Sequence, residues 1–160
     1  GESNMKKVFF TGQRTIENDI ETIPKLMKTI KNLLMEGATD FYAGGAIGWD
    51  MLCENVILIL RDERVPYIKL HLVLPCPPEE HTARWSRLDK EEYLKILEAA
   101  DSVEIVSEHY SKECLKKHNA RLAETGDICV CYYDEKSRRS GAAQTVRMAK
   151  KPGKKIINLR

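Results

Sequence analysis

Short runs of β-forming residues alternate with amphipathic helical segments along the whole chain. Strand-like runs occur at 6–11, 40–43, 68–74, 101–107, 127–133 and 154–159, and their apolar composition is typical of buried strands. Between them, apolar residues recur at three- and four-residue steps, for example over 20–34, which predicts helices. Parallel strands need such helical crossovers. The alternation therefore predicts a three-layer α/β fold, in which helices cover both faces of a doubly wound, mostly parallel sheet of about six strands.

Length and composition indicate one domain with a core of its own. The chain has 160 residues, of which 42% are hydrophobic. This is enough for one compact unit and too little for two ordinary ones. We expect the domain to span residues 5–160, with residues 1–4 forming a disordered tail or a cloning remnant.

The sequence also favours a cytoplasmic protein that does not enter a membrane. No apolar run approaches the ~20 residues that cross a bilayer, and the N-terminus shows no charged-then-apolar leader. The five cysteines are odd in number and scattered, which fits a reducing compartment. Cys76 and His81 could contribute to a metal site, but without a second pair of ligands they predict none.

Charge is nearly balanced overall and uneven along the chain. The formal net charge is +2, which disfavours a protein that grips a long polyanion with its whole surface. From Lys136 to Arg160 there are nine Lys or Arg and no Asp or Glu. We interpret this basic end as the solvated face of the last helix and strand, with an anionic ligand or a nucleic-acid contact as the alternative.

One strand-to-helix corner has the composition of a ligand site. Residues 41–50 read Phe-Tyr-Ala-Gly-Gly-Ala-Ile-Gly-Trp-Asp, so Gly44, Gly45 and Gly48 lie between a strand and a helix. Glycines permit positive φ and close approach of a bound group, and the free N–H groups of a first helical turn favour a phosphate. Asp50 could cap the helix or accept a hydrogen bond from a sugar hydroxyl. The alternative is a corner that is merely tightly packed.

Other unusual loops follow the carboxyl ends of the predicted strands, where ligands bind in doubly wound folds. A helix opened by Ser140 and Gly141 would bring a second N-terminus to this edge. Arg14 could pair with a phosphate and Trp85 could stack on a base, with a surface arginine and a core tryptophan as the alternatives. The candidate ligand-binding residues at this edge are Gly12, Gln13, Arg14, Gly44, Gly45, Gly48, Asp50, Pro75, Trp85, Tyr110, Asn119, Tyr133, Ser140 and Gly141.

Familiar nucleotide-binding and hydrolase motifs are absent from the sequence. It contains no G-x-G-x-x-G after the first strand, no G-x-x-x-x-G-K-[ST] and no G-x-S-x-G. Asp50 is the candidate for acid–base chemistry, while Glu79 and Glu80 read as solvated surface acids. The sequence therefore offers no self-evident nucleophile.

Several of these motifs together resemble the YpsA-like family of the SLOG superfamily. The resemblance rests on Thr11-Gly12-Gln13-Arg14, the glycine corner at 44–50, Pro75 with Trp85, Tyr110, Asn119, and Ser140-Gly141 with Thr145-Val146. It implies a Rossmann-like fold related to the lonely-guy phosphoribohydrolases and to DNA-processing protein A. It also implies binding of a nucleotide or a derivative such as ADP-ribose or an NAD-like molecule, and it adds Thr145 to the candidate ligand-binding residues.

The chain departs from the family pattern at three places. Gln13 stands where the family usually has His in a T-G-H-R motif, and Ser140-Gly141-Ala142 stands where it has Gly-Gly-Thr. The late loop also lacks the P-G-G-x-G-T-x-x-E run of the lonely-guy enzymes, whose glutamate is tied to cleavage of the N-glycosidic bond. These departures weaken the expectation of a phosphoribohydrolase.

Three functions from different classes follow. The leading hypothesis is a sensing or regulatory domain that binds a nucleotide-derived ligand, and that ligand is the one cofactor candidate that the sequence suggests. The first alternative is an N-glycosidic bond hydrolase that uses Asp50. The second is a DNA-processing accessory protein that uses the basic end, and it ranks last because of the low net charge. A homodimer formed through exposed helices is a further expectation.

Overall fold

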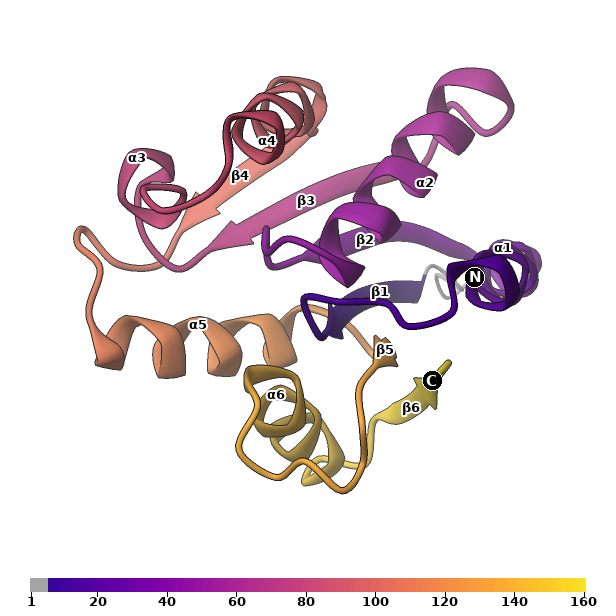
Figure 1. The fold of residues 1–160 in the computed structure, drawn as a ribbon. Coiled ribbons are helices and arrows are strands. Elements are labelled where there is room, and N and C mark those ends of the chain that lie inside the picture. The colour runs from indigo at the N-terminus through magenta and orange to yellow at the C-terminus, as the bar shows by residue number, and fades with distance from the viewer. Residues whose placement is uncertain (1–5) are drawn as a thin grey trace.

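A computed structural model describes residues 6–160; the expected tail at 1–4 and Met5, the expected first residue of the domain, lie outside the described residues. Residues 6–160 form six strands and six helices, which alternate except that two helices lie between the third and fourth strands (Figure 1). None of these helices is both long and apolar enough to cross a membrane. The strands are β1 (Lys6–Gly12), β2 (Ala38–Ala43), β3 (Lys69–Leu74), β4 (Ser102–Ile105), β5 (Ile128–Tyr132) and β6 (Lys155–Asn158). The helices are α1 (Asp19–Met35), α2 (Trp49–Glu63), α3 (Pro78–His81), α4 (Arg87–Ala99), α5 (Lys112–Thr125) and α6 (Gly141–Lys150).

The sheet is parallel throughout, in the order β4-β3-β2-β1-β5-β6. The chain steps outward from β1 to β4, returns through α5, and continues on the other side of β1 with β5 and β6. Strand order therefore reverses between β1 and β5, and ligands of doubly wound folds bind beside such a reversal. The predicted α/β, Rossmann-like fold is confirmed.

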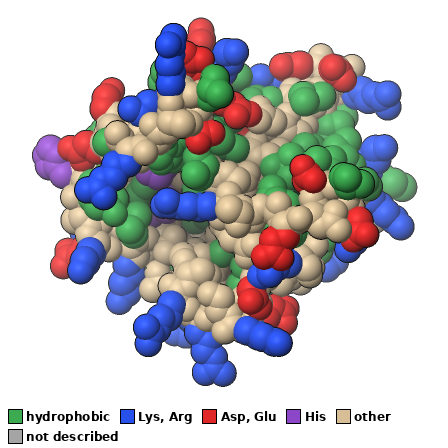
Figure 2. All heavy atoms as spheres, viewed as in Figure 1, with side chains coloured by type: hydrophobic (Ala, Val, Ile, Leu, Met, Phe, Trp, Pro, Cys, Tyr) green, Lys and Arg blue, Asp and Glu red, His purple; other side chains and the backbone are tan. Residues whose placement is uncertain are grey.

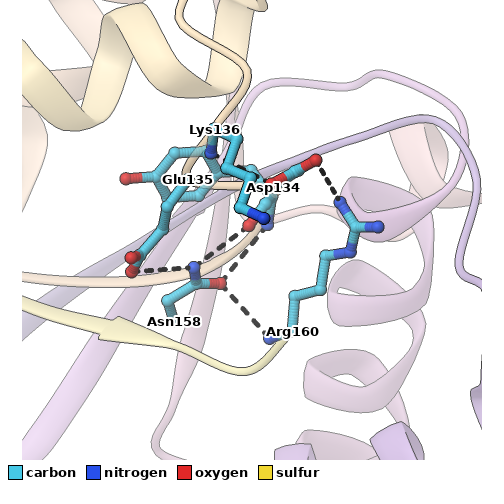
Figure 3. Close-up of a pocket in the computed structure, with 6 residues that line it drawn as sticks. Asp134, Glu135, Lys136, Asn158 and Arg160 are labelled. Carbon is cyan, nitrogen blue, oxygen red and sulfur yellow. Dashed lines mark hydrogen bonds and ion pairs between the residues drawn. The ribbon is translucent and has the colours of Figure 1, made fainter.

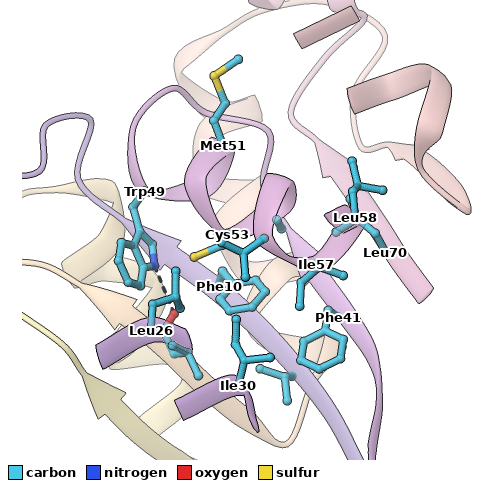
Figure 4. Close-up of a cluster of buried hydrophobic side chains, with 14 of the residues drawn as sticks. Phe10, Leu26, Ile30, Phe41, Trp49, Met51, Cys53, Ile57, Leu58 and Leu70 are labelled. Atoms are coloured by element: carbon cyan, nitrogen blue, oxygen red, sulfur yellow. Dashed lines mark hydrogen bonds between the residues drawn. The ribbon is translucent and has the colours of Figure 1, made fainter. Parts of the chain in front are cut away.

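Two buried layers hold the helices to the sheet. Helices α1, α2 and α4 pack on one face and α5 and α6 on the other (Figure 1). Side chains alternate along each strand, so Val8 and Phe10 of β1 enter the first layer and Phe9 enters the second. In the first layer the fully buried Trp49 donates its indole N–H to the carbonyl of Val130, at 3.3 Å (Figure 4). This contact fixes the start of α2 over the centre of the sheet.

One strand is shorter than predicted, and the segment between β3 and α4 contains a helix of its own. The strand expected at 101–107 spans only Ser102–Ile105 and ends there because β3, its one neighbour in the sheet, ends at the paired residue Leu74. Just before the strand, the Asp101 carboxylate accepts hydrogen bonds from the Leu70 N–H and from Arg61, both at 2.8 Å. Between β3 and α4, residues Pro78–His81 form the short helix α3, which Pro78 begins. Proline suits the first position of a helix because its missing N–H would have no partner there.

Candidate functional site

Four glycines lie at or just after the ends of β1 and β2, and at each of them other atoms of the protein occupy the space that a Cβ would need. A Cβ on Gly12 would clash with the Trp49 side chain, and one on Gly48 would clash with the backbone of Arg14. A Cβ on Gly45 would lie 2.6 Å from Leu74, and Gly45 and Gly48 have φ of +77° and +84°. Gly44 meets His118 in the same way, at 2.9 Å. These glycines therefore serve close packing, and their contact with a ligand stays a prediction.

Asp50 holds the backbone of this corner from inside the protein. It is the second residue of α2 and only 5% exposed. Its Oδ2 accepts the Ala46 N–H at 3.1 Å, while Oδ1 has no partner among the described residues. Burial raises the pKa of Asp50 to about 7, although hydrogen bonds from Ala46 and Gly44 partly oppose the shift. The carboxyl can therefore hold a proton near neutral pH.

Two further buried polar side chains, which the sequence analysis missed, lie close to Asp50. Glu54 is one helical turn later on the same helix, is 1% exposed, and has an Oε2 without a partner in residues 6–160. Burial raises its pKa well above the ordinary value. The hydroxyl of Tyr93 on α4 is equally buried and unpaired in that part of the chain. The four-residue spacing of Asp50 and Glu54 could have revealed the first neighbour, but nothing in the sequence places Tyr93 there.

His81 closes the outer side of this region. Its Nε2 lies 3.0 Å from the carbonyl oxygen of Gly45, and its ring packs edge-on against Trp85 and Tyr93, at 5.1 and 5.8 Å. Burial lowers the pKa of His81, and the positive charge of Arg14 lowers it further. Figure 2 shows histidine atoms sunk in a hollow of this face with a Lys or Arg side chain beside them. Trp85 is half-buried against His81, Tyr93 and the core. This packing agrees with the alternative interpretation of Trp85 as a core residue.

Helix α5 connects the glycine corner to the start of α6. The buried His118 places its Nε2 2.6 Å from the carbonyl oxygen of Val73, and its ring lies against Gly44. Burial lowers the pKa of His118 to about 4, so the imidazole is neutral and donates this hydrogen bond. The next residue, Asn119, donates from Nδ2 to Oε1 of Gln144 on α6, at 2.8 Å. Asn119 therefore faces α6 rather than the corner.

The start of α6 leaves space beside its glycine, whereas the glycines at 44–48 are tightly packed. The Ser140 hydroxyl caps the helix by accepting the Ala143 N–H at 3.0 Å, and no acidic residue lies in the first turn. A Cβ on Gly141 would meet only Asn119, at an ordinary 3.7 Å. Thr145 is fully buried and donates its hydroxyl to the Gly141 carbonyl, at 2.9 Å. Thr145 thus positions the first turn from inside.

An open pocket of about 590 Å³ lies beside the ends of β5 and β6 (Figure 3). The Asn158 amide braces one wall by donating to the carbonyl of Tyr133, at 3.0 Å. Arg160 crosses toward β1, where it donates to Gln13 Oε1 at 3.4 Å. The lining residues are Tyr133, Asp134, Glu135, Lys136, Asn158 and Arg160.

Three of the predicted ligand-binding residues lie outside the glycine corner, the start of α6 and the pocket. Arg14 is exposed above the corner, and residues 6–160 offer it no ion pair. Pro75 is buried, and its carbonyl accepts the Ser107 N–H at 3.1 Å. Tyr110 lies on the loop before α5 and donates its N–H to Glu80 at 2.6 Å. The structure thus gathers most candidates around β1, β2, β5 and α6, with Tyr110 beside α3.

Comparison with known proteins agrees with this architecture. The family model described as the YspA SLOG family matches residues 8–159. A UPF0398 protein of Shouchella clausii is 32% identical over 123 residues, which cover 72% of this chain and 63% of the relative. A UPF0398 protein of Staphylococcus haemolyticus is 27% identical over 147 residues, covering 85% of this chain and 77% of the relative. The chain thus spans under two thirds of the length of the first of these relatives. With a family match along almost its full length, the chain belongs to the YspA SLOG family.

Proposed function

We propose that this chain binds a nucleotide-derived ligand, such as ADP-ribose or an NAD-like molecule, at the carboxyl edge of the sheet in a sensing role. The observation that carries the proposal is the open start of α6 beside the reversal of strand order. Gly141 is exposed there, with only Asn119 near the position of a Cβ. Free N–H groups of a first helical turn attract phosphate, and no acidic side chain opposes that attraction.

The surrounding groups suit the rest of such a ligand. Arg138 and Arg139 precede the helix and supply positive charge for a phosphate. Tyr133 offers an aromatic wall to the pocket, and the carboxylates of Asp134 and Glu135 can accept hydrogen bonds from ribose hydroxyls. This pocket is open to solvent and lined mainly by charged side chains, and its volume of about 590 Å³ lies in the range of small-molecule sites.

The direct test is a thermal-shift and calorimetric titration with AMP, ADP, NAD and ADP-ribose. Ligand at ~100 times its dissociation constant should stabilise the native state by about 2.7 kcal/mol. Gly141→Leu should weaken binding at least tenfold, because its side chain would fill open space over the first turn. Ala83→Leu adds comparable bulk to an exposed position between α3 and α4 and serves as the control. Absence of any shift, or unchanged affinity in Gly141→Leu, would contradict the proposal.

Asp50 favours one second candidate, hydrolysis of an N-glycosidic bond. A carboxyl with a pKa of about 7 can donate a proton to a leaving base. Chromatography of the titrated samples distinguishes the two functions, since a sensor returns its ligand intact and a hydrolase releases free base. Base release that survives in Asp50→Asn would exclude this carboxyl as the proton donor.

A further inference from the structure

A carboxylate, an imidazole and a hydroxyl form a continuous hydrogen-bonded chain across three adjacent strands. Oδ1 of Asp40 on β2 lies 2.6 Å from Nε2 of His71 on β3. Nδ1 of the same ring lies 2.6 Å from Oγ of Ser102 on β4. Each residue is 31 positions from the next in sequence, so only the parallel sheet brings them together. No sequence motif predicts that Asp40, His71 and Ser102 lie together.

Neighbouring contacts hold the imidazole and keep the carboxylate ionised. Burial raises the pKa of Asp40, but hydrogen bonds from His71 and Thr39 outweigh that effect and lower it below the usual value. Thr39 donates to the second carboxylate oxygen at 2.8 Å. The Tyr42 ring stacks on the imidazole with 4.6 Å between centroids. The side chains of His71 and Asp40 are 16% and 24% exposed, whereas Ser102 is exposed.

We infer that Ser102 is a nucleophile activated by His71 and positioned by Asp40, and that it cleaves small activated esters. The ionised Asp40 accepts the Nε2–H of His71, and in that tautomer the lone pair on Nδ1 faces the Ser102 hydroxyl. Carboxylate, imidazole and hydroxyl in this order form the constellation that activates serine in unrelated hydrolases. The two ring nitrogens exchange places here relative to that template, and either nitrogen can act as the base.

The reaction needs only the ester and water. Ser102 Oγ attacks the carbonyl carbon while its proton moves to His71 Nδ1, and the carbonyl π electrons move to oxygen. When the carbonyl re-forms, the bond to the leaving oxygen breaks and that oxygen takes the proton from Nδ1. Water then attacks the acyl-serine with His71 again as base, which releases the carboxylic acid and restores the Ser102 hydroxyl.

The open edge of the sheet limits the class of substrate. The Asp101 N–H donates to the Leu70 carbonyl at 2.8 Å. Because N–H directions alternate along a strand, the Ser102 N–H points away from β3 and can donate to the developing oxyanion. All four residues of β4 are exposed. A short acyl group with its leaving group in solvent fits this surface.

The test treats the purified chain with a fluorophosphonate probe and, separately, with p-nitrophenyl acetate. Peptide mass spectrometry should find the phosphonyl group on Ser102, and nitrophenolate release should follow the same pH dependence as labelling. Ser102→Ala should remove both, and His71→Gln should slow labelling by at least ~10²-fold, the contribution of a general base. In Asp40→Asn labelling should be slower than in the unchanged chain, because no carboxylate then holds the Nε2–H tautomer that leaves Nδ1 free to act as the base.

Ser137→Ala removes another exposed serine hydroxyl and should label at the rate of the unchanged chain. Circular dichroism establishes that each variant is folded, and site mapping on the unchanged chain does not depend on any variant. The inference is overturned by an unlabelled Ser102 after exhaustive treatment, by labelling at another residue alone, or by equal rates in His71→Gln. Nucleotide titrations are independent of all three outcomes.

Discussion

Two strand-to-helix turns reach the same edge of the sheet and treat their glycines in opposite ways. At the start of α2, Gly48 has φ of +84° and its missing side chain is replaced by the backbone of Arg14. At the start of α6, Gly141 faces open space. The first N–H group of α2 also has a partner within the protein, because the Trp49 N–H donates to the Gln13 carbonyl at 3.2 Å. Similar local composition therefore produces a structural joint in one place and an open helix end in the other.

The largest effect on stability is expected when a methyl group is added at Gly48, in the tightly packed turn before α2. Gly48→Ala should lower the free energy of unfolding by about 2–5 kcal/mol, the sum of roughly 1–2 kcal/mol for the left-handed backbone and roughly 1–3 kcal/mol for overpacking. Urea denaturation measures the loss. Gly153→Ala is the matched control, since Gly153 has φ of +81° and no heavy atom within 4 Å of its Cβ position. It should show the backbone cost alone; equal losses in the two variants would contradict the close contact at Gly48.

The buried carboxyl beneath the joint should make stability depend on pH. The pKa of Asp50 is about 7 in the folded chain, against an ordinary value of 3.8. The native state therefore holds a proton that the unfolded state releases, and stability falls as pH rises from about 4 to about 7. This contribution amounts to roughly 4 kcal/mol. It should be absent in Asp50→Asn.

His118 opposes this trend, because burial lowers its pKa to about 4 and stability falls as pH drops below the ordinary value of 6.5. The quantity to measure is thus the difference in unfolding free energy between Asp50→Asn and the unchanged chain at each pH. That difference should rise by roughly 4 kcal/mol in favour of the variant between pH 4 and pH 7. A flat difference would mean that Asp50 ionises normally in the folded protein.

The contrast between the turns also explains how far sequence reasoning could reach. Strand and helix periods predicted the α/β architecture and placed both glycine turns at one edge, because these patterns are local. What fills the space beside each glycine is not local. Leu74 against Gly45 and His118 against Gly44 come from β3 and α5, and no period connects them to the corner.

The same limit applies to polar groups. Glu54 follows Asp50 by one helical turn, so its place on the same face was readable from spacing. The contacts among Asp40, His71 and Ser102 depend instead on strand order and on the exact register of β3 against β4. A one-residue slip would turn one of these side chains to the opposite face, and the sequence alone does not determine that register.

A moderate effect is expected from removing the cap of the open turn. Ser140→Ala loses the hydrogen bond from the Ala143 N–H and should cost about 1 kcal/mol of unfolding free energy. It should also weaken nucleotide binding, because the first turn of α6 loses its anchor. Ser86→Ala removes the corresponding cap of α4, where the Asp89 N–H donates at 3.2 Å. Similar stability loss in both variants, with weakened binding in Ser140→Ala alone, would separate the site from general helix stability.

The smallest effect has the opposite sign. Gly141→Ala adds a methyl group at the first position of α6, where φ is not positive and the nearest atom is 3.7 Å away. It should raise the free energy of unfolding by about 0.4–1 kcal/mol, because alanine has fewer unfolded conformations to lose. Chemical denaturation of this variant beside Gly48→Ala tests the comparison directly, since one methyl group stabilises at the open turn and destabilises at the joint. Destabilisation by Gly141→Ala would show that the start of α6 is as tightly packed as the start of α2.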